Sequence, residues 1–161
     1  MSAKKQLLAQ YDLHNLLYNN VFLDINEEEA NTRLLPSINN IKWLAGHLLW
    51  VQTNLARLCG LQIEIIWIDH YNNQISQRPG PEINVPSLEE IKSTWNQHAA
   101  TIRRGLENLS DEELNSPVEF PIPAFRTKEG LWAFINHHQA YTIGQIGILR
   151  RGFGKEAMKY S

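Results

Sequence analysis

The sequence predicts an all-α protein, a four-helix bundle with a long crossover connection between its second and third helices. Three observations support this prediction. Apolar residues recur at helical spacing in four long segments, capping residues precede three of these segments, and strand-like patterns are few and short. Helices of roughly 20 residues, about 30 Å long, suit such a bundle. The 161 residues are expected to form a single domain, 1–161.

The first helix is predicted from about Lys4 to Leu23. Its stripe repeats at helical spacing and comprises Leu7, Tyr11, His14, Tyr18, Val21 and Ile25. The acidic residues 26–31 and the segment 34–36 that follows are interpreted as a connecting stretch, because the periodic pattern stops there.

The second helix is predicted from about Ile38 to Cys59, with Ser37 as its N-cap and Gly60 as its stop. Its stripe comprises Ile41, Leu44, Leu48, Val51, Leu55 and Leu58. Residues 60–86 form the long connection. A connection of this length lets the chain travel back along the bundle, so the second and third helices are expected to run parallel.

Ser87 and Glu90 form a capping box that starts the third helix at Leu88. The stripe of this helix comprises Leu88, Ile91, Trp95, His98, Ile102, Leu106 and Leu109. Residues 110–113 are expected to cap one further turn. The prolines that follow favour an extended segment; they are Pro117, Pro121 and Pro123.

The fourth helix is predicted from about Lys128 to Arg151, capped by Thr127. Gly152 and Gly154 are expected to end it, because glycine commonly follows the last helical turn.

Composition excludes several classes of function. The net charge of −2 and the pI near 6.3 argue against a general nucleic-acid-binding protein, so no nucleic-acid partner is expected. No apolar run approaches the roughly 20 residues that span a bilayer, and no signal peptide or membrane partner is expected. The single cysteine, Cys59, excludes an intrachain disulfide and favours the reducing cytoplasm as the location.

Each of the four predicted helices carries a histidine near its midpoint: His14, His47, His98 and His138. Two interpretations remain open. In the first, the four imidazoles form a central layer around a divalent ion, since metal sites in helix bundles are built from side chains of facing helices. Alternatively, each is a partly buried histidine that bonds to a neighbouring hydroxyl or carbonyl group.

Aromatic residues and glycines flank two of these histidines. Trp43 and Trp50 lie near His47 in sequence, where they either wall a substrate pocket or pack in the core, and core packing is favoured. Gly46 and Gly144 are expected to allow a close helix approach.

Two segments together resemble the DinB/YfiT-like superfamily. Residues 40–48, NIKWLAGHL, are similar to its second-helix motif, and residues 138–146, HQAYTIGQI, to its fourth-helix motif. The order of the helices, the long second connection and the segment 109–114, LSDEEL, are similar as well, so the resemblance covers nearly the whole chain. It implies a four-helix bundle of unusual crossover topology that is often a homodimer.

The resemblance also implies a divalent metal, zinc or nickel, bound by three histidines. Matched residue by residue, two of these ligands fall on His47 and His138, and the third falls on Thr142. A neutral hydroxyl group is a poor ligand for zinc or nickel but can hold a metal-bound water. The resemblance therefore implies a site with two of the three usual ligands. The candidates for positioning a ligand or lining the pocket are Thr142, Gln145, His98, His14 and Trp43.

The resemblance implies an activity as well. Its well-understood members are thiol transferases that use bacillithiol, mycothiol or glutathione, whereas many others are named as damage-inducible without a known activity. Three functions remain open for this chain. It is a metal-dependent enzyme that transfers a small thiol or catalyses a related hydrolysis, a non-catalytic protein that binds a small molecule at a degenerate metal site, or a dimeric scaffold.

Overall fold

The computed structural model describes residues 2–67, 71, 86–122 and 125–161. These residues form four long helices and two short ones, and they confirm the predicted all-α fold. An isolated bridge joins Pro117 to Thr127. The helices are α1 (Ala3–Val21), α2 (Glu27–Asn31), α3 (Ile41–Leu58), α5 (Leu88–Asn108), α6 (Asp111–Asn115) and α7 (Lys128–Gly152).

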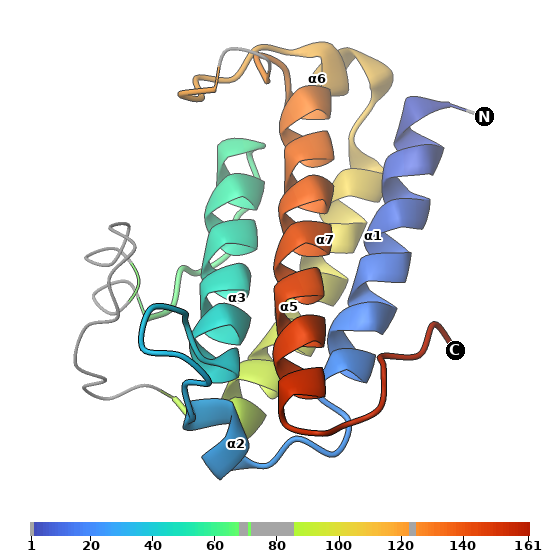
Figure 1. Cartoon of the computed structure of the whole chain (residues 1–161). Helices are drawn as coiled ribbons and strands as arrows, with labels where there is room; N and C mark the ends of the chain where they lie inside the picture. Colours follow the sequence, from blue (N-terminus) through green and yellow to red (C-terminus); the bar gives the residue numbers. More distant parts are fainter. Residues whose placement is uncertain (1, 68–70, 72–85, 123–124) are drawn as a thin grey trace.

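The four long helices lie side by side, with α2 at one end of the bundle and α6 at the other (Figure 1). Helices α1 and α3 each pack against both α5 and α7. Helices α1 and α3 are therefore diagonal to each other, and two tyrosines of α1 link them through the core. The Tyr18 hydroxyl group donates to the carbonyl oxygen of Ala45 at 3.3 Å, and the Tyr11 hydroxyl group donates to Oε1 of Gln52 at 3.1 Å.

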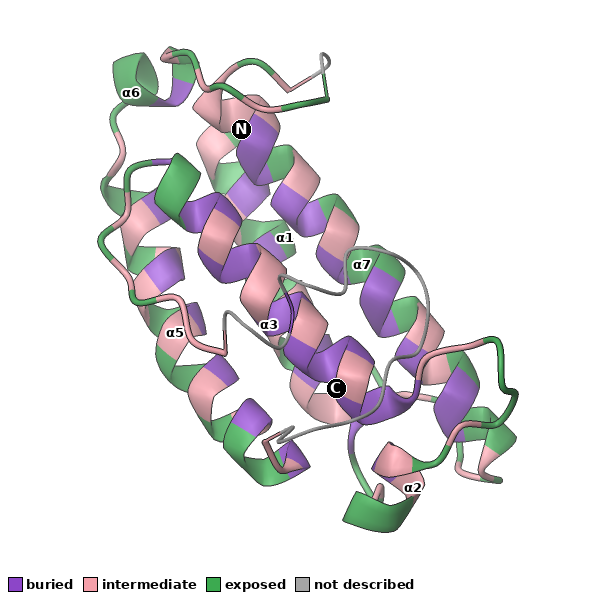
Figure 2. Cartoon of the chain, turned by 90° about the vertical axis from the view of Figure 1, so that its left-hand side faces the viewer, coloured by how far each residue is buried: buried purple, intermediate pink, exposed green. Residues whose placement is uncertain are grey.

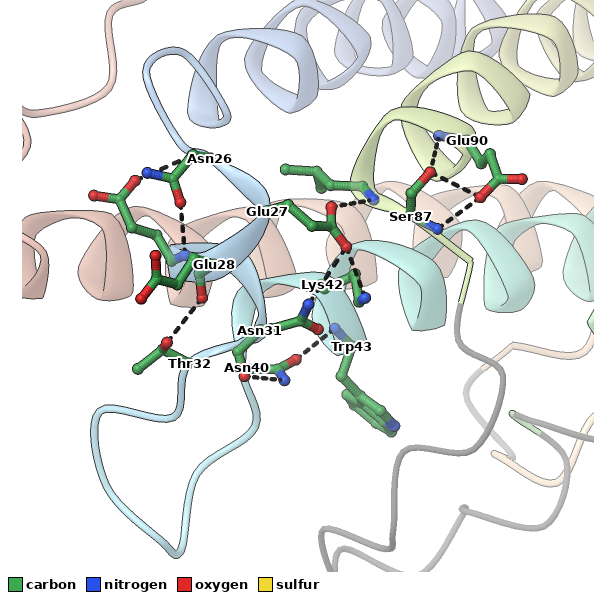
Figure 3. Close-up of polar contacts among 12 residues, drawn as sticks. Asn26, Glu27, Glu28, Asn31, Thr32, Asn40, Lys42, Trp43, Ser87 and Glu90 are labelled. Carbon is green, nitrogen blue, oxygen red and sulfur yellow. Dashed lines mark hydrogen bonds and ion pairs between the residues drawn. The ribbon is translucent and has the colours of Figure 1, made fainter.

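Helices α3 and α5 begin at the same end of the bundle, beside α2. The carboxylate of Glu27 accepts a hydrogen bond from Nζ of Lys42 at 2.8 Å and another from the backbone N–H of Leu88 at 2.8 Å (Figure 3). Lys42 lies in the first turn of α3 and Leu88 begins α5, so the two helices run in the same direction. Most of the predicted connection between them, residues 68–70 and 72–85, lies outside the described residues.

Three predicted caps are confirmed. In each cap a side-chain hydroxyl group accepts a hydrogen bond from the backbone N–H three residues later. The pairs are Ser87 with Glu90, Ser110 with Glu113, and Thr127 with Gly130. Gly60 follows the end of α3 with a φ of 98°, a conformation that glycine adopts without strain. These signals are readable from the sequence because each depends on residues close together in the chain.

The predicted start of the second helix is wrong. Ser37 does not cap this helix, because Oδ1 of Asn40 accepts a hydrogen bond from the N–H of Trp43 at 2.8 Å and α3 starts at Ile41 (Figure 3). The amide of Asn40 also donates to the carbonyl oxygen of Asn31 at 2.9 Å. Since the buried Asn40 side chain bonds both to the first turn of α3 and to Asn31, tertiary structure selects it as the cap over the exposed Ser37.

The predicted connection after the first helix holds a further helix. Asn26 and Glu29 form a capping box that starts α2, and the acidic residues of its first turn favour the helix dipole. Helix α1 ends at Val21 rather than Leu23, because the chain turns at Asp24, where φ is 61°.

Apolar residues on the inward faces of the long helices form one core, which appears as buried stripes in Figure 2. Trp95 and Trp132 are completely buried in it. The ring of Tyr18 stacks on Trp95 with centroids 3.7 Å apart, and Tyr11 meets Trp132 edge to face at 6.3 Å. Among the described helices, none is both long and apolar enough to cross a membrane.

We expect Glu27→Ala to lower the free energy of unfolding by about 1–3 kcal/mol, because it leaves the buried Lys42 ammonium and the Leu88 N–H without their acceptor. Urea denaturation at neutral pH measures the loss. Glu28→Ala is the matched control, since this exposed neighbour also lies in the first turn of α2. Equal stability of the two variants would contradict the assigned role of Glu27.

Candidate functional site

Two histidines from facing helices meet inside the bundle. His47 of α3 and His138 of α7 have ring centroids 5.5 Å apart with planes at 63°. His47 lies one residue before the buried Leu48, and His138 lies one residue before the buried Gln139. Both rings are therefore half-buried beside the core stripe of their own helix. The packing of α3 against α7 brings the two rings together.

Aromatic side chains surround this pair. The ring of Trp43 stacks on His47 with centroids 4.6 Å apart, and Trp50 lies 6.3 Å from His47. Tyr71 lies 6.5 Å from His47, and Phe134 lies 6.2 Å from His138. Trp43 and Trp50 are half-buried, so the favoured prediction of core packing describes them only in part.

The two predicted close-approach glycines differ. Tyr71 fills the space where Gly46 lacks a side chain, so the close approach there is made by a residue from the segment between α3 and α5. At Gly144 no helix of the same chain approaches, because a Cβ atom added there meets no other atom within 4 Å among the described residues. Gly144 lies on the exposed side of α7.

Burial keeps both imidazoles neutral. It lowers the pKa of His47 to about 4, with the neighbouring His138 as a second cause. It likewise lowers the pKa of His138 to about 4, with His137 as the second cause. Nδ1 of His138 is buried and has no hydrogen-bond partner in the part of the chain that the structure describes. Neutral imidazole with a free lone pair is the form that binds metals.

The spacing of the rings suits one shared metal ion. A zinc–nitrogen bond of about 2.0–2.1 Å would place an ion roughly 3 Å from each ring centroid. Two rings at a tetrahedral angle then have centroids about 5 Å apart, close to the 5.5 Å between His47 and His138. Within the described ranges, no group of three or more histidine, cysteine or acidic side chains is placed to hold a metal.

Thr142 and Gln145 follow His138 on α7. Thr142, one turn after His138, is buried with 1% of its surface exposed. Gln145 lies about two turns after His138 on the same side of the helix and is half-buried. Both residues therefore lie on the side of α7 that carries His138.

The other two mid-helix histidines lie elsewhere. Nδ1 of His98 lies 3.1 Å from the Thr53 hydroxyl group, and Thr53 is six residues, about 9 Å of helix, beyond His47. His14 lies beside Asn136 and Gln139, on the side of α7 that faces α1. Burial lowers the pKa of both His14 and His98. The structure thus brings together His47 and His138 without His14 or His98.

Sequence reasoning missed several residues near these histidines. Phe134 joins the pair to the segment between α6 and α7. The centroid of its ring lies 5.3 Å from that of Phe120 and 5.2 Å from that of Phe125. Gln52 and Gln139 bond to each other in the core at 2.9 Å. The burial of Gln139 could have been predicted from the sequence, because Gln139 lies between Ile135 and Ile143 at a spacing of four residues, on the apolar stripe of the helix.

Comparison with known proteins gives a family and a structural relative. The family model described as the DinB superfamily matches residues 10–146. No curated protein sequence matches the chain. A crystal structure of a DinB-like protein, YjoA from Bacillus subtilis, is similar with a TM-score of 0.68, 13% sequence identity and 96% of each chain covered. At this identity the likeness shows the fold alone.

The lowered pKa values predict a pH dependence of stability for the metal-free protein. Between a pKa of 6.5 in the unfolded chain and about 4 in the folded protein, the unfolded state binds more protons at His47 and His138. The free energy of unfolding should therefore fall as the pH drops from about 6.5 to about 4. Between pH 7 and pH 5 we expect a loss of about 2 kcal/mol per histidine.

Urea denaturation in the presence of a chelator measures this loss. The variant His47→Gln/His138→Gln should lose this part of the pH dependence, whereas the exposed His137→Gln should retain it. An unchanged slope in the double variant would show that the pair does not titrate as described.

Proposed function

Because this chain belongs to the DinB superfamily, we propose that it is a metal-dependent enzyme in which His47 and His138 hold one divalent ion, zinc or nickel. The observation that carries the proposal is the meeting of two neutral imidazoles from facing helices, 5.5 Å apart. The buried Nδ1 atom of His138 supports it, because this atom has no hydrogen-bond partner among the described residues and a buried polar atom without a partner is costly unless a ligand satisfies it.

In this proposal the protein orients the reactants and restricts water. A bound ion supplies Lewis-acid chemistry that favours the deprotonated form of a thiol or a water. Trp43 stacks on His47 and holds that ring in place. The indole N–H of Trp50 is buried without a partner among the described residues, so it is available to donate a hydrogen bond to substrate. Thr142 and Gln145 are proposed to position water or substrate.

The proposed substrate is a small thiol such as bacillithiol, mycothiol or glutathione, and the proposed reaction is transfer of the whole thiol to an electrophile, or a related hydrolysis. In the transfer, the thiolate sulfur forms a bond to the electrophilic carbon, while the thiol proton and the leaving group of the electrophile pass to solvent. The aromatic rings around the histidines suit the apolar part of such a reactant. Loss of free thiol in the presence of a reactive electrophile, with and without metal, measures this activity. It should depend on both His47 and His138.

A second candidate function is supported by Thr142. This buried hydroxyl residue stands at the third ligand position that the family resemblance implies. Under this alternative the metal site is degenerate, and the same region binds a small molecule without catalysis. Metal binding separates the two proposals.

Under the first proposal, we expect about one zinc or nickel ion per chain after incubation with the metal and removal of the excess. His47→Ala and His138→Ala should each remove most of this metal. His137→Ala should retain it, because the neighbouring His137 is exposed. Elemental analysis of folded, tag-free protein is the measurement.

Absence of bound metal under every loading condition would contradict the first proposal and support the second. Thr142→His then tests whether the site has lost its third ligand. Under the second proposal this variant should gain metal binding that the wild type lacks. Under the first it should raise the metal affinity by about tenfold or more, because a third imidazole joins the two already present.

We also propose that the protein forms a homodimer through the exposed side of α7. Tyr141 and Ile148 are 63% and 74% exposed, and they lie seven residues apart on the same side of the helix. Gly144 and Gly147 between them leave room for a second helix, since an added Cβ atom at either meets nothing within 4 Å among the described residues. Ile148→Glu should convert the dimer to a monomer in light scattering, whereas Leu35→Glu, at another exposed apolar residue, should not. A monomeric wild type would contradict this proposal.

A further inference from the structure

Five polar side chains form a buried group between α1, α3 and α7, here called the amide layer. Its members are Tyr11, His14, Gln52, Asn136 and Gln139. Tyr11, Gln52 and Gln139 are each 1% exposed and Asn136 is 2% exposed, whereas His14 is half-buried. Polar side chains this deeply buried are normally fully hydrogen-bonded. The amide layer includes neither His47 nor His138.

Hydrogen bonds join the members of the amide layer across helices. Oε1 of Gln52 accepts from the Tyr11 hydroxyl group at 3.1 Å and from Nε2 of Gln139 at 2.9 Å. Nδ2 of Asn136 donates to the carbonyl oxygen of Leu7 at 3.1 Å. Gln139 and Asn136 both lie close enough to His14 to favour its charged form against the effect of burial. The five side chains therefore lie in one continuous region.

Four atoms of the amide layer nevertheless have no hydrogen-bond partner among the described residues. They are Nδ1 of His14, Nε2 of Gln52, Oδ1 of Asn136 and Oε1 of Gln139. Rotating the amides of Gln52 and Gln139 together by 180° preserves the bond between them and exchanges the donor and the acceptor at the two remaining positions. In either orientation, each glutamine has one polar atom outside the bond that joins the two amides.

The unpaired atoms are complementary to a molecule that both donates and accepts. Gln52 offers an N–H donor, whereas Asn136 and Gln139 offer carbonyl oxygens. No ionised carboxylate or ammonium group belongs to the layer, so a charged ligand would lack a counter-charge there. The chemistry favours a small uncharged molecule with both donor and acceptor capacity.

We propose that the amide layer is an internal binding site for ordered water, held between α1, α3 and α7 by Gln52, Asn136, Gln139 and His14. Water forms two to four hydrogen bonds with such groups, and globular proteins contain roughly one buried water per 27 residues. The bound water completes the contact between α3 and α7 at the bond from Gln139 to Gln52. The proposal does not depend on metal binding or catalysis.

Magnetic relaxation dispersion of water nuclei tests the proposal, because it detects water molecules that exchange slowly from a protein interior. The wild type should show a long-lived water signal. Gln52→Met/Gln139→Met keeps the length of both side chains but removes their polar atoms, and it should reduce the signal by about half or more. Gln97→Met is the matched control, since Gln97 is exposed on α5 and its replacement should leave the signal unchanged.

Absence of a long-lived water signal in the wild type would overturn the proposal, as would an unchanged signal in the folded double variant. If the double variant does not fold, a high-resolution crystal structure of the wild type decides. Density for a water within hydrogen-bond distance of at least two of the four unpaired atoms supports the proposal. Density for a larger molecule, or no density there, overturns it.

Discussion

The carboxylate of Glu27 holds the end of the bundle at which α3 and α5 begin. Its two oxygens accept from Lys42 and from the backbone of Leu88, so one side chain fixes the starts of two helices (Figure 3). With that start fixed, the position of His47 along the bundle axis is fixed as well. A slip of α3 by one turn, about 5.4 Å, would carry His47 away from His138. The candidate site thus depends on an ion pair outside it.

Between α3 and α7, Gln52 and Gln139 form a hydrogen bond, and the rings of His47 and His138 lie next to each other. Apolar packing tolerates small shifts between helices, whereas a buried amide finds its partner only in one register. The two glutamines therefore align the helices that carry the two histidines. Burial keeps those histidines neutral, which removes the repulsion that two charged rings 5.5 Å apart would suffer. Each neutral ring keeps one nitrogen lone pair.

Local sequence signals predicted the fold class and most helix starts correctly. The caps at Ser87 and Thr127 involve residues three apart, so no distant contact is needed to recognise them. The choice of Asn40 over Ser37 was missed, because it depends on the carbonyl oxygen of Asn31 in another helix. Among the histidines, spacing placed all four near mid-helix, but it could not show that His98 bonds with Thr53 or that His14 joins the amide layer.

The sequence by itself determined that this chain forms amphipathic helices, where most of them start, and which family it resembles. These properties follow from periodicity, capping and motifs, which act over a few residues or are read position by position. Only the tertiary structure decided which histidines meet, which core amides bond to each other, and which residue fills the space at Gly46. Helical periodicity sets the rotation of each side chain about its own axis. The axial register between helices comes from contacts such as Glu27 with Lys42, between residues far apart in the chain.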